Sequence, residues 1–267
     1  MFGLVRRGSV KFLEAAEMSA LGFVTHAFCT RQGGVSEGPF ADLNVGDRVG
    51  DREAAVKRNL ALLGEAFAIG EERLLLMRQV HGDSIRVIDG AMPLPGEMPE
   101  CDGMITDRPG VALGVRTADC VPLFFVDRVR RVIGAAHAGW RGAALGMAAR
   151  MAGAMRERFS SRREDILAVI GPAIGPCCYE VDAPVFAALS SRREAERFLI
   201  PGGKDRWMLD LAELNRLQLL ECGLPEENIL AAGFCTACRQ DLFFSHRAGR
   251  GSTGRQLNFL MLNAGGD

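Results

Sequence analysis

The chain contains only four histidines, and two of them stand where apolar runs give way to turns. His81 lies in Arg78–Asp83 (RQVHGD), at the end of an apolar run and directly before a glycine. His137 follows a β-branched run and is surrounded by alanine and glycine, which let a ligand or another backbone segment approach closely. Each histidine also has an ordinary interpretation, His81 as a half-exposed turn residue and His137 as part of a packing motif.

Cys120 is a third candidate, between two apolar runs in Arg116–Pro122 (RTADCVP). Binding a metal ion or attacking a substrate requires the thiolate, and the neighbouring Asp119 does not favour that form. If Cys120 does chemistry, a metal ion or a basic group must therefore lie beside it. Otherwise it is a buried structural cysteine.

Two histidines and one thiolate form a recognised ligand set for zinc, with metal–ligand distances of about 2.0–2.3 Å and a fourth position open to water. His81, Cys120 and His137 are far apart in the sequence, which excludes a zinc finger and is typical of a catalytic site. With one thiolate bound, zinc keeps a net positive charge and still acidifies bound water. The sequence therefore predicts a catalytic zinc ion held by these three residues.

The same residues leave other interpretations open. Without a metal, Cys120 would act as the nucleophile of a hydrolase or deamidase, with His137 or His81 as its base. A set of two histidines and one cysteine also accepts copper. A binding protein that only stores a metal ion would keep the same three residues. We favour the zinc enzyme over these alternatives.

A phosphate site is expected next to His137. The pattern predicts a helix that begins near Gly142, and the free N–H groups of a helix N-terminus bind anions. The guanidinium of Arg141 would add positive charge at this point.

Two cysteine pairs stand apart from this set. Cys235 and Cys238 form a C-x-x-C, which is half of a structural zinc site, and no second pair stands at the usual spacing. Cys177 and Cys178 are adjacent in a segment rich in glycine and proline. We interpret the first pair as structural or incidental and the second as part of loop packing.

The composition is that of a folded soluble protein. Its 267 residues, 48% apolar and 24% charged, suit a single domain over 1–267, with 1–20 as a peripheral segment. The net charge of −1 argues against nucleic acid or a membrane as partner. The N-terminus has no signal-peptide pattern, and no window approaches the roughly 18 apolar residues of a membrane span. We therefore expect a cytoplasmic protein whose eight cysteines are thiols.

Strands and helices must position these candidates. Apolar, β-branched runs predict buried strands, and apolar residues at helical spacing predict helices. The alternation of the two predicts an α/β (α+β) fold of mixed β-sheets flanked by helices. The expected strands are Phe23–Thr30, Leu74–Val80, Ile85–Ile88, Val111–Val115, Val121–Val126, Val132–Ala136, Ile166–Ile170, Ile229–Ala232, Leu242–Ser245 and Leu257–Leu262; the expected helices are Arg52–Ala66, Gly142–Phe159 and Leu209–Glu221, with a surface loop at Gly90–Glu100.

Seven segments, taken in order, resemble the YfiH-type laccase-domain family. The resemblance runs from about Gly22 to Leu262, nearly the whole chain. The segments are His26–Asp51, Arg78–Asp83, Cys101–Asp107 (CDGMITD), Gly114–Leu123 (GVRTADCVPL), Ala135–Gly142, Gly171–Val181 (GPAIGPCCYEV) and Cys235–Leu262.

The resemblance implies a compact domain of mixed sheets flanked by helices, with His81, Cys120 and His137 as the metal-binding, catalytic residues. Members have been named polyphenol oxidases or multicopper laccases. The family is now associated with phosphorolysis of adenosine, inosine and 5′-methylthioadenosine, with adenosine deamination, and in some bacteria with correction of peptidoglycan precursors. The sequence departs from the family at His246–Ala248, where relatives often have Tyr-Arg-Arg, and this change affects substrate contacts of that loop.

The laccase name conflicts with the histidine count. A multicopper oxidase needs about eight histidines for its trinuclear cluster alone, and this chain has four. A copper-loaded polyphenol oxidase is therefore an alternative that we place second.

The resulting hypothesis is a purine nucleoside phosphorylase and adenosine deaminase whose substrates are purine nucleosides and phosphate. Zinc would activate water for attack on C6 of adenine, and phosphate would attack C1′ of the ribose. Besides Arg141, the candidate substrate contacts are Arg31, Asn44 and Arg247. We expect a monomer or a weak homo-oligomer.

Overall fold

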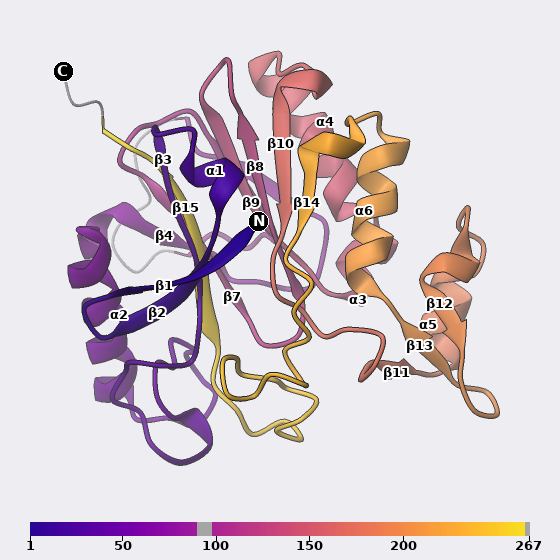
Figure 1. Cartoon of the computed structure of the whole chain (residues 1–267), viewed down its shortest axis with the longest axis horizontal. Coiled ribbons are helices and arrows are strands. Elements are labelled where there is room, and N and C mark those ends of the chain that lie inside the picture. Colours follow the sequence, from indigo (N-terminus) through magenta and orange to yellow (C-terminus); the bar gives the residue numbers. More distant parts are fainter. Residues whose placement is uncertain (90–97, 265–267) are drawn as a thin grey trace.

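The computed structural model describes residues 1–89 and 98–264, and two six-stranded sheets that pack face to face form its centre (Figure 1). The first sheet has the strand order β1 (Phe2–Arg7), β2 (Val10–Ala15), β3 (Val24–Cys29), β15 (Gln256–Leu262), β7 (Ala112–Thr117), β4 (Leu74–Leu76). The second has the order β14 (Ile229–Ala231), β10 (Ile166–Ile170), β8 (Val121–Asp127), β9 (Val132–Ala138), β6 (Gly103–Thr106), β5 (Ile85–Val87).

Helices cover the outer faces of both sheets. The helix α2 packs on the first sheet, and α4 and α6 pack on the second, which gives four layers in the order helix, sheet, sheet, helix. A small third sheet lies beside α5. The helices are α1 (Ala16–Ser19), α2 (Glu53–Phe67), α3 (Trp140–Ala144), α4 (Met147–Phe159), α5 (Ala183–Leu189) and α6 (Leu211–Glu221); the third sheet is β11 (Glu180–Val181), β13 (Trp207–Leu209), β12 (Leu199–Pro201).

Central strands are buried on both faces because each sheet is covered on both sides. In β8, Leu123 and Phe125 point toward the helices, whereas Phe124 points toward the first sheet. The ring of Phe124 stacks on that of Phe28 in β3, with 4.5 Å between the ring centroids. The long apolar runs of the sequence therefore reflect strands that contribute side chains to two cores.

The predicted α/β fold of mixed sheets flanked by helices is confirmed. The pairs β4–β7, β5–β6 and β10–β14 are parallel, and the remaining pairs within the two large sheets are antiparallel. No helix among residues 1–89 and 98–264 combines the length and the apolar character that crossing a membrane requires.

Three predicted elements differ from the structure. The helix expected over Gly142–Phe159 is two helices, because Gly146 adopts a φ of +85° between α3 and α4. The strand expected over Leu242–Ser245 is a loop, since the backbone N–H of Phe244 donates to the side chain of Gln256 rather than to a neighbouring strand. The strand expected over Leu74–Val80 ends at Leu76, where the chain turns toward the second sheet.

Two further expectations concern residues 1–20 and the predicted surface loop. Residues 1–20 lie at the edge of the first sheet, as a peripheral segment would, but Val10, Phe12 and Leu13 of β2 are fully buried in the cores. The segment is thus part of the packed structure. Most of the loop expected at Gly90–Glu100 lies outside the described residues.

Candidate active site

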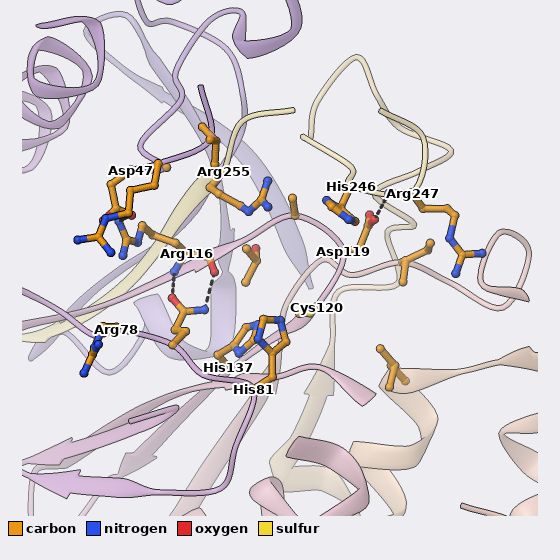
Figure 2. A pocket seen from close by; sticks show the side chains of 18 of the residues that line it. Asp47, Arg78, His81, Arg116, Asp119, Cys120, His137, His246, Arg247 and Arg255 are labelled. Atoms are coloured by element: carbon orange, nitrogen blue, oxygen red, sulfur yellow. Dashed lines mark hydrogen bonds and ion pairs between the residues drawn. The ribbon is translucent and has the colours of Figure 1, made fainter. Parts of the chain in front are cut away.

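The structure brings His81, Cys120 and His137 together at one end of the two sheets (Figure 2). The nitrogen and sulfur atoms that they offer all lie within 4.8 Å of one another. Cys120 lies in the turn by which the chain passes from β7 in the first sheet to β8 in the second, and His81 lies in the similar passage from β4 to β5. His137 is on β9.

A buried carboxylate fixes the turn that carries His81. The backbone N–H groups of Val80, His81 and Gly82 all donate to the side chain of Asp102, at 3.1, 3.1 and 2.7 Å. Successive N–H groups that converge in this way form an anion-binding nest. These bonds hold the backbone of His81 at a φ of +60°, a conformation that residues other than glycine seldom adopt.

The same carboxylate fixes the ring of His137. Nδ1 of His137 lies 2.8 Å from Oδ1 of Asp102, and because a carboxylate only accepts, Nδ1 is the donor. Strand register produces this contact: Gly103 pairs with Ala136, and the N–H of His137 donates to the carbonyl of Asp102 at 2.8 Å. In the neutral imidazole that a metal ion binds, Nε2 of His137 is therefore the nitrogen with the free lone pair.

Asp119 holds the turn that carries Cys120. Its φ is +92°, and its carboxylate accepts hydrogen bonds from the hydroxyl of Thr236 at 2.6 Å and the backbone N–H of Arg247 at 2.7 Å. Both donors come from the C-terminal part of the chain. The position of Cys120 therefore depends on segments that are more than a hundred residues away in the sequence.

Gly139 allows the backbone to approach the three side chains. A Cβ atom at this position would lie 3.0 Å from Sγ of Cys120 and 3.1 Å from Cδ2 of His81. Any larger residue would displace one of the two. The small residues around His137 predicted such a close approach.

Without a metal, Cys120 and His137 form a charged pair. Burial alone would raise the pKa of Cys120, but the charge of His137 and hydrogen bonds from both histidines outweigh it and lower the pKa to about 6. Burial opposes protonation of His137, but the Cys120 thiolate and Asp102 raise its pKa to about 9. The basic group that Cys120 needs for chemistry is therefore His137.

The donor set fits a single zinc ion. It offers two imidazole nitrogens and one thiolate at mutually compatible distances. The hydrogen bond from His137 to Asp102 is the carboxylate–histidine arrangement that accompanies metal-binding histidines. Cys120 and His81 also border a cavity, which leaves a side of the site accessible to a water molecule or a substrate.

The cavity beside this site has a volume of about 610 Å³. Five arginines contribute to its lining, against the carboxylates of Asp47 and Asp119, so its walls favour an anion. Figure 2 shows Arg255 between Arg116 on one side and His246 on the other. The arginines are Arg48, Arg78, Arg116, Arg247 and Arg255.

The four other residues singled out in the sequence occupy different places. Arg247 lines the cavity, and its guanidinium lies over the ring of Tyr179, 5.0 Å from the centroid. Arg141 is exposed on α3 and stacks on Trp140, outside the cavity lining. The remaining two hold loops together.

Arg31 donates from Nε to the carbonyl of Ala41 at 2.6 Å and lies over the ring of Phe244. Asn44 is fully buried, and its Oδ1 accepts from the N–H groups of Gly46 and Arg255, both at 2.8 Å. Asn44 therefore affects the cavity indirectly, by positioning the backbone of Gly46 and Arg255, which line it.

Sequence reasoning missed Asp102, Arg116 and Arg255. Asp102 lies in a segment that carried the family resemblance. Its neighbours in the sequence do not reveal that pairing of β6 with β9 places it beside His137. The available signal is an acidic residue close to the apolar pair Met104 and Ile105. The structure buries Asp102 fully, and such a group must have partners. In the sequence alone, nothing distinguishes Arg116 and Arg255 from arginines on an ordinary surface.

Comparison with known proteins identifies the family. Residues 25–263 match the model of a family described as multi-copper polyphenol oxidoreductase laccase. The chain belongs to this laccase-domain family. Purine nucleoside phosphorylase YlmD of Geobacillus stearothermophilus is 43% identical over 242 residues, covering 86% of this chain and 87% of that protein. Purine nucleoside phosphorylase YfiH of Escherichia coli is 34% identical over 238 residues, covering 87% of this chain and 91% of that protein.

Solved structures of the laccase-domain family share the fold. The crystal structure of YlmD from Geobacillus stearothermophilus matches with a TM-score of 0.89 at 38% identity, over 98% of this chain and 99% of that one. A Neisseria meningitidis protein, NMB0706, matches with a TM-score of 0.82 at 31% identity, over the same shares. The family resemblance inferred from the seven segments is thus confirmed.

We expect Asp102→Asn to weaken zinc binding by roughly 10–100-fold, the range typical of losing the outer partner of a metal-binding histidine. An amide cannot accept from all four N–H groups that the carboxylate serves, so both His137 and the His81 turn lose their orientation. Competition with a chromophoric chelator measures the affinity.

Asp127→Asn is the matched control for this variant. Asp127 is also fully buried and accepts from the N–H groups of Val129 and Arg130, at 2.9 and 2.8 Å, at the opposite end of β8. Equal zinc affinities in the two variants would contradict the role given to Asp102.

The reactivity of Cys120 in metal-free protein should follow its thiolate. Because the pKa is lowered to about 6, thiolate accumulates as the pH rises through that value, and alkylation by iodoacetamide should be half-maximal near pH 6. Mass spectrometry of the Cys120 peptide measures the rate. Cys222, whose pKa is raised by burial, is the internal control and should react slowly at neutral pH. A Cys120 rate that climbs only above about pH 8, as for an ordinary thiol, would refute the charged pair.

Proposed function

We propose that this chain is a zinc-dependent purine nucleoside phosphorylase that acts on adenosine, inosine and 5′-methylthioadenosine and also deaminates adenosine. The observation that carries the proposal is the meeting of His81, Cys120 and His137 beside an arginine-lined cavity of about 610 Å³. Small-molecule sites typically enclose roughly 300–1,000 Å³. The names of the similar YlmD and YfiH proteins support the phosphorylase part of this proposal.

Zinc, when bound, supplies a Lewis acid that polarises an oxygen or acidifies a water molecule beside the substrate. The chain prepares that site. Asp102 keeps the proton of His137 on Nδ1, and the pKa of Cys120, lowered to about 6, makes the thiolate available at neutral pH. Metal binding therefore does not have to compete with a proton on sulfur.

Arg255 and Arg116 are the residues that we assign to phosphate. Both line the cavity, Arg255 with Nη1 bonded to the carbonyls of Thr253 and Gly254, and Arg116 paired with Asp47. Burial lowers the pKa of Arg255, so a phosphate anion beside it would stabilise the charged guanidinium. Arginine binds phosphate oxygens through two N–H groups at once, which also orients the anion.

Two reactions share this cavity in the proposal. In phosphorolysis, a phosphate oxygen forms a bond to C1′ of the ribose while the bond from C1′ to the purine nitrogen breaks. In deamination, water adds at C6 of adenine and ammonia leaves, which converts adenosine to inosine. A site that positions both phosphate and water next to a purine nucleoside accounts for both products.

The four residues predicted from the sequence to contact substrate have different roles in the proposal. Arg247 lines the cavity and is retained as a direct substrate contact. Asn44 acts through Arg255, whose backbone it binds, and Arg31 acts through the loop that it holds to Phe244. Arg141 remains a candidate for phosphate only if the anion binds outside the lining described above.

Incubation with adenosine, with and without phosphate, tests the proposed activity. Metal-replete protein should release adenine and ribose 1-phosphate only when phosphate is present, and should form inosine in both cases; liquid chromatography measures the products. The variants His81→Ala, Cys120→Ala and His137→Ala should lose the zinc ion of this site and both activities together. Absence of adenine, hypoxanthine and inosine with the metal-replete protein would refute the proposal.

Comparing Arg255→Gln with Arg141→Gln decides which arginine holds phosphate. We expect Arg255→Gln to raise the KM for phosphate by roughly 10–100-fold, the equivalent of one lost charge-assisted hydrogen bond, with a smaller effect on the KM for adenosine. Arg141→Gln should change neither constant, because Arg141 is exposed and lies outside the cavity lining. The reverse pattern would transfer the phosphate site to α3.

The charged pair of Cys120 and His137 favours a second candidate, a metal-free hydrolase or deamidase with Cys120 as nucleophile. Alkylation would then abolish turnover and a chelator would not. Loss of turnover on chelation, with recovery on adding zinc, supports the metal enzyme. A copper-loaded polyphenol oxidase has less support, since His26 is buried with Nε2 accepting from the N–H of Ala15 and does not join the site.

A further inference from the structure

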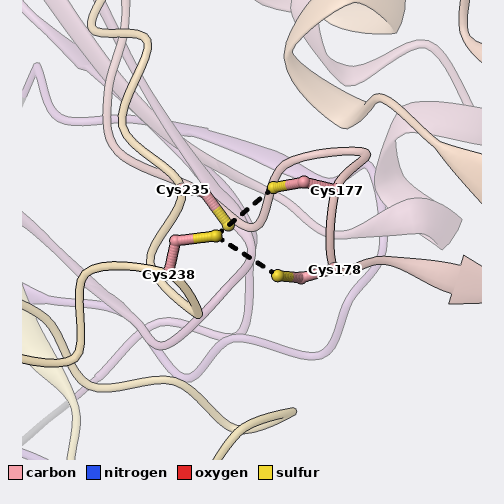
Figure 3. Close-up of side chains that lie close together, drawn as sticks. All are labelled: Cys177, Cys178, Cys235 and Cys238. Carbon is pink, nitrogen blue, oxygen red and sulfur yellow. Dashed lines mark hydrogen bonds between the residues drawn. The ribbon is translucent and has the colours of Figure 1, made fainter.

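The fold supplies the second cysteine pair that no standard spacing in the sequence reveals. Cys177 and Cys178 lie opposite Cys235 and Cys238, and the four sulfur atoms are all within 4.8 Å of one another (Figure 3). Sγ of Cys238 is 3.5 Å from that of Cys177 and 3.4 Å from that of Cys178. All four residues are free thiols.

We propose that these four cysteines bind a structural zinc ion, separate from the site formed by His81, Cys120 and His137. Four thiolates at about 2.3 Å from one zinc ion form a tetrahedron whose edges are about 3.8 Å. The observed spacing brackets that value. It is too long for disulfides, whose sulfurs are about 2.0 Å apart.

Backbone bonds hold the two cysteine-bearing loops together from both sides. Ala173 and Cys235 form a parallel bridge, in which Ala173 donates to the carbonyl of Phe234 at 3.2 Å and Thr236 donates to the carbonyl of Ala173 at 3.0 Å. In addition, the N–H of Gly175 donates to Sγ of Cys235 at 3.3 Å. A backbone donor to sulfur stabilises a thiolate, the form that zinc binds. The ligands are therefore placed before the ion arrives.

The chemistry of the cluster selects a soft divalent cation. Only sulfur is offered, which favours zinc over hard cations such as magnesium or calcium. Four ligands complete a tetrahedron and leave no position for water, which is the character of structural zinc sites. Iron–sulfur clusters also use four cysteines, but they place several atoms between the thiolates and therefore require a wider separation of the sulfurs.

The proposed zinc ion would fix one wall of the cavity. Ile174 and Tyr179, which line it, flank Cys177 and Cys178 in the sequence. Thr236, between the other two cysteines, donates to Asp119 beside Cys120. Joining the two loops through an ion would therefore stabilise the turn that carries Cys120 as well as the surface that a substrate contacts.

Metal analysis of the protein purified under reducing conditions and loaded with zinc tests the inference. We expect about two zinc ions per chain, and about one in Cys238→Ser or in Cys120→Ala. Cys222→Ser, which removes a cysteine outside both clusters, should retain two. Cys238 is the residue of choice because it is exposed and contacts both cysteines of the opposite loop.

The result also separates this inference from the proposed function. One zinc ion that survives Cys238→Ser and disappears in Cys120→Ala overturns the four-cysteine site alone. One zinc ion that disappears in Cys238→Ser and survives in Cys120→Ala supports the four-cysteine site and overturns the proposed zinc enzyme.

Two measurements on the unmodified chain avoid reliance on variants that fold poorly. Cobalt substituted for zinc in the unmodified chain should show the intense thiolate-to-metal charge transfer of a four-sulfur site, stronger than the single thiolate of Cys120 can give. Intact mass under native conditions distinguishes bound zinc from a pair of disulfides. Finding disulfides after purification with reductant, or iron with acid-labile sulfide, would overturn the proposal.

Discussion

A single buried carboxylate determines the geometry of the candidate active site. Asp102 accepts hydrogen bonds from three successive backbone N–H groups in the turn of His81 and from the ring of His137. His81 comes from the connection between β4 and β5 and His137 from β9, so without this shared partner they would be oriented independently. Burying an unpaired carboxylate is costly, which means that the site forms only when all four donors are in place. The bonds from His137 and the backbone also keep the pKa of Asp102 low, despite burial.

The arrangement of the sheets explains why the site lies where it does. The chain passes between the two sheets from β4 to β5 and again from β7 to β8, and these passages carry His81 and Cys120. Side chains at the middle of a strand are buried in one of the cores, whereas a crossing turn lies at the end of both sheets. Polar ligands can therefore gather there without disturbing the packing. Arg255, at the start of β15, reaches the same end.

The sequence was sufficient to predict the class of fold and to select His81, Cys120 and His137 as candidates. It was insufficient to predict the residues that hold these three side chains in place. His81 and His137 are conspicuous because histidine is rare in this chain and both follow apolar runs. Asp102 depends on the pairing of Gly103 with Ala136, and strand register cannot be read from either strand alone. Arg141 was chosen for its nearness to His137 in sequence, but the exposed face of α3 directs it away from the cavity lining that includes Arg255.

The two clusters of potential ligands differ in ways that assign them different roles. His81, Cys120 and His137 supply three donors beside a cavity, and a fourth position facing that cavity is available to a reacting molecule. The four cysteines supply a complete set of donors, so an ion held by them has no position left for a substrate. Four thiolates more than cancel the charge of a divalent ion and leave the site negative, whereas one thiolate leaves it positive. Under the proposed function, activation of water and attraction of phosphate would therefore belong to the first site. The second would hold the two loops that carry Tyr179 and Thr236, the residue that donates to Asp119.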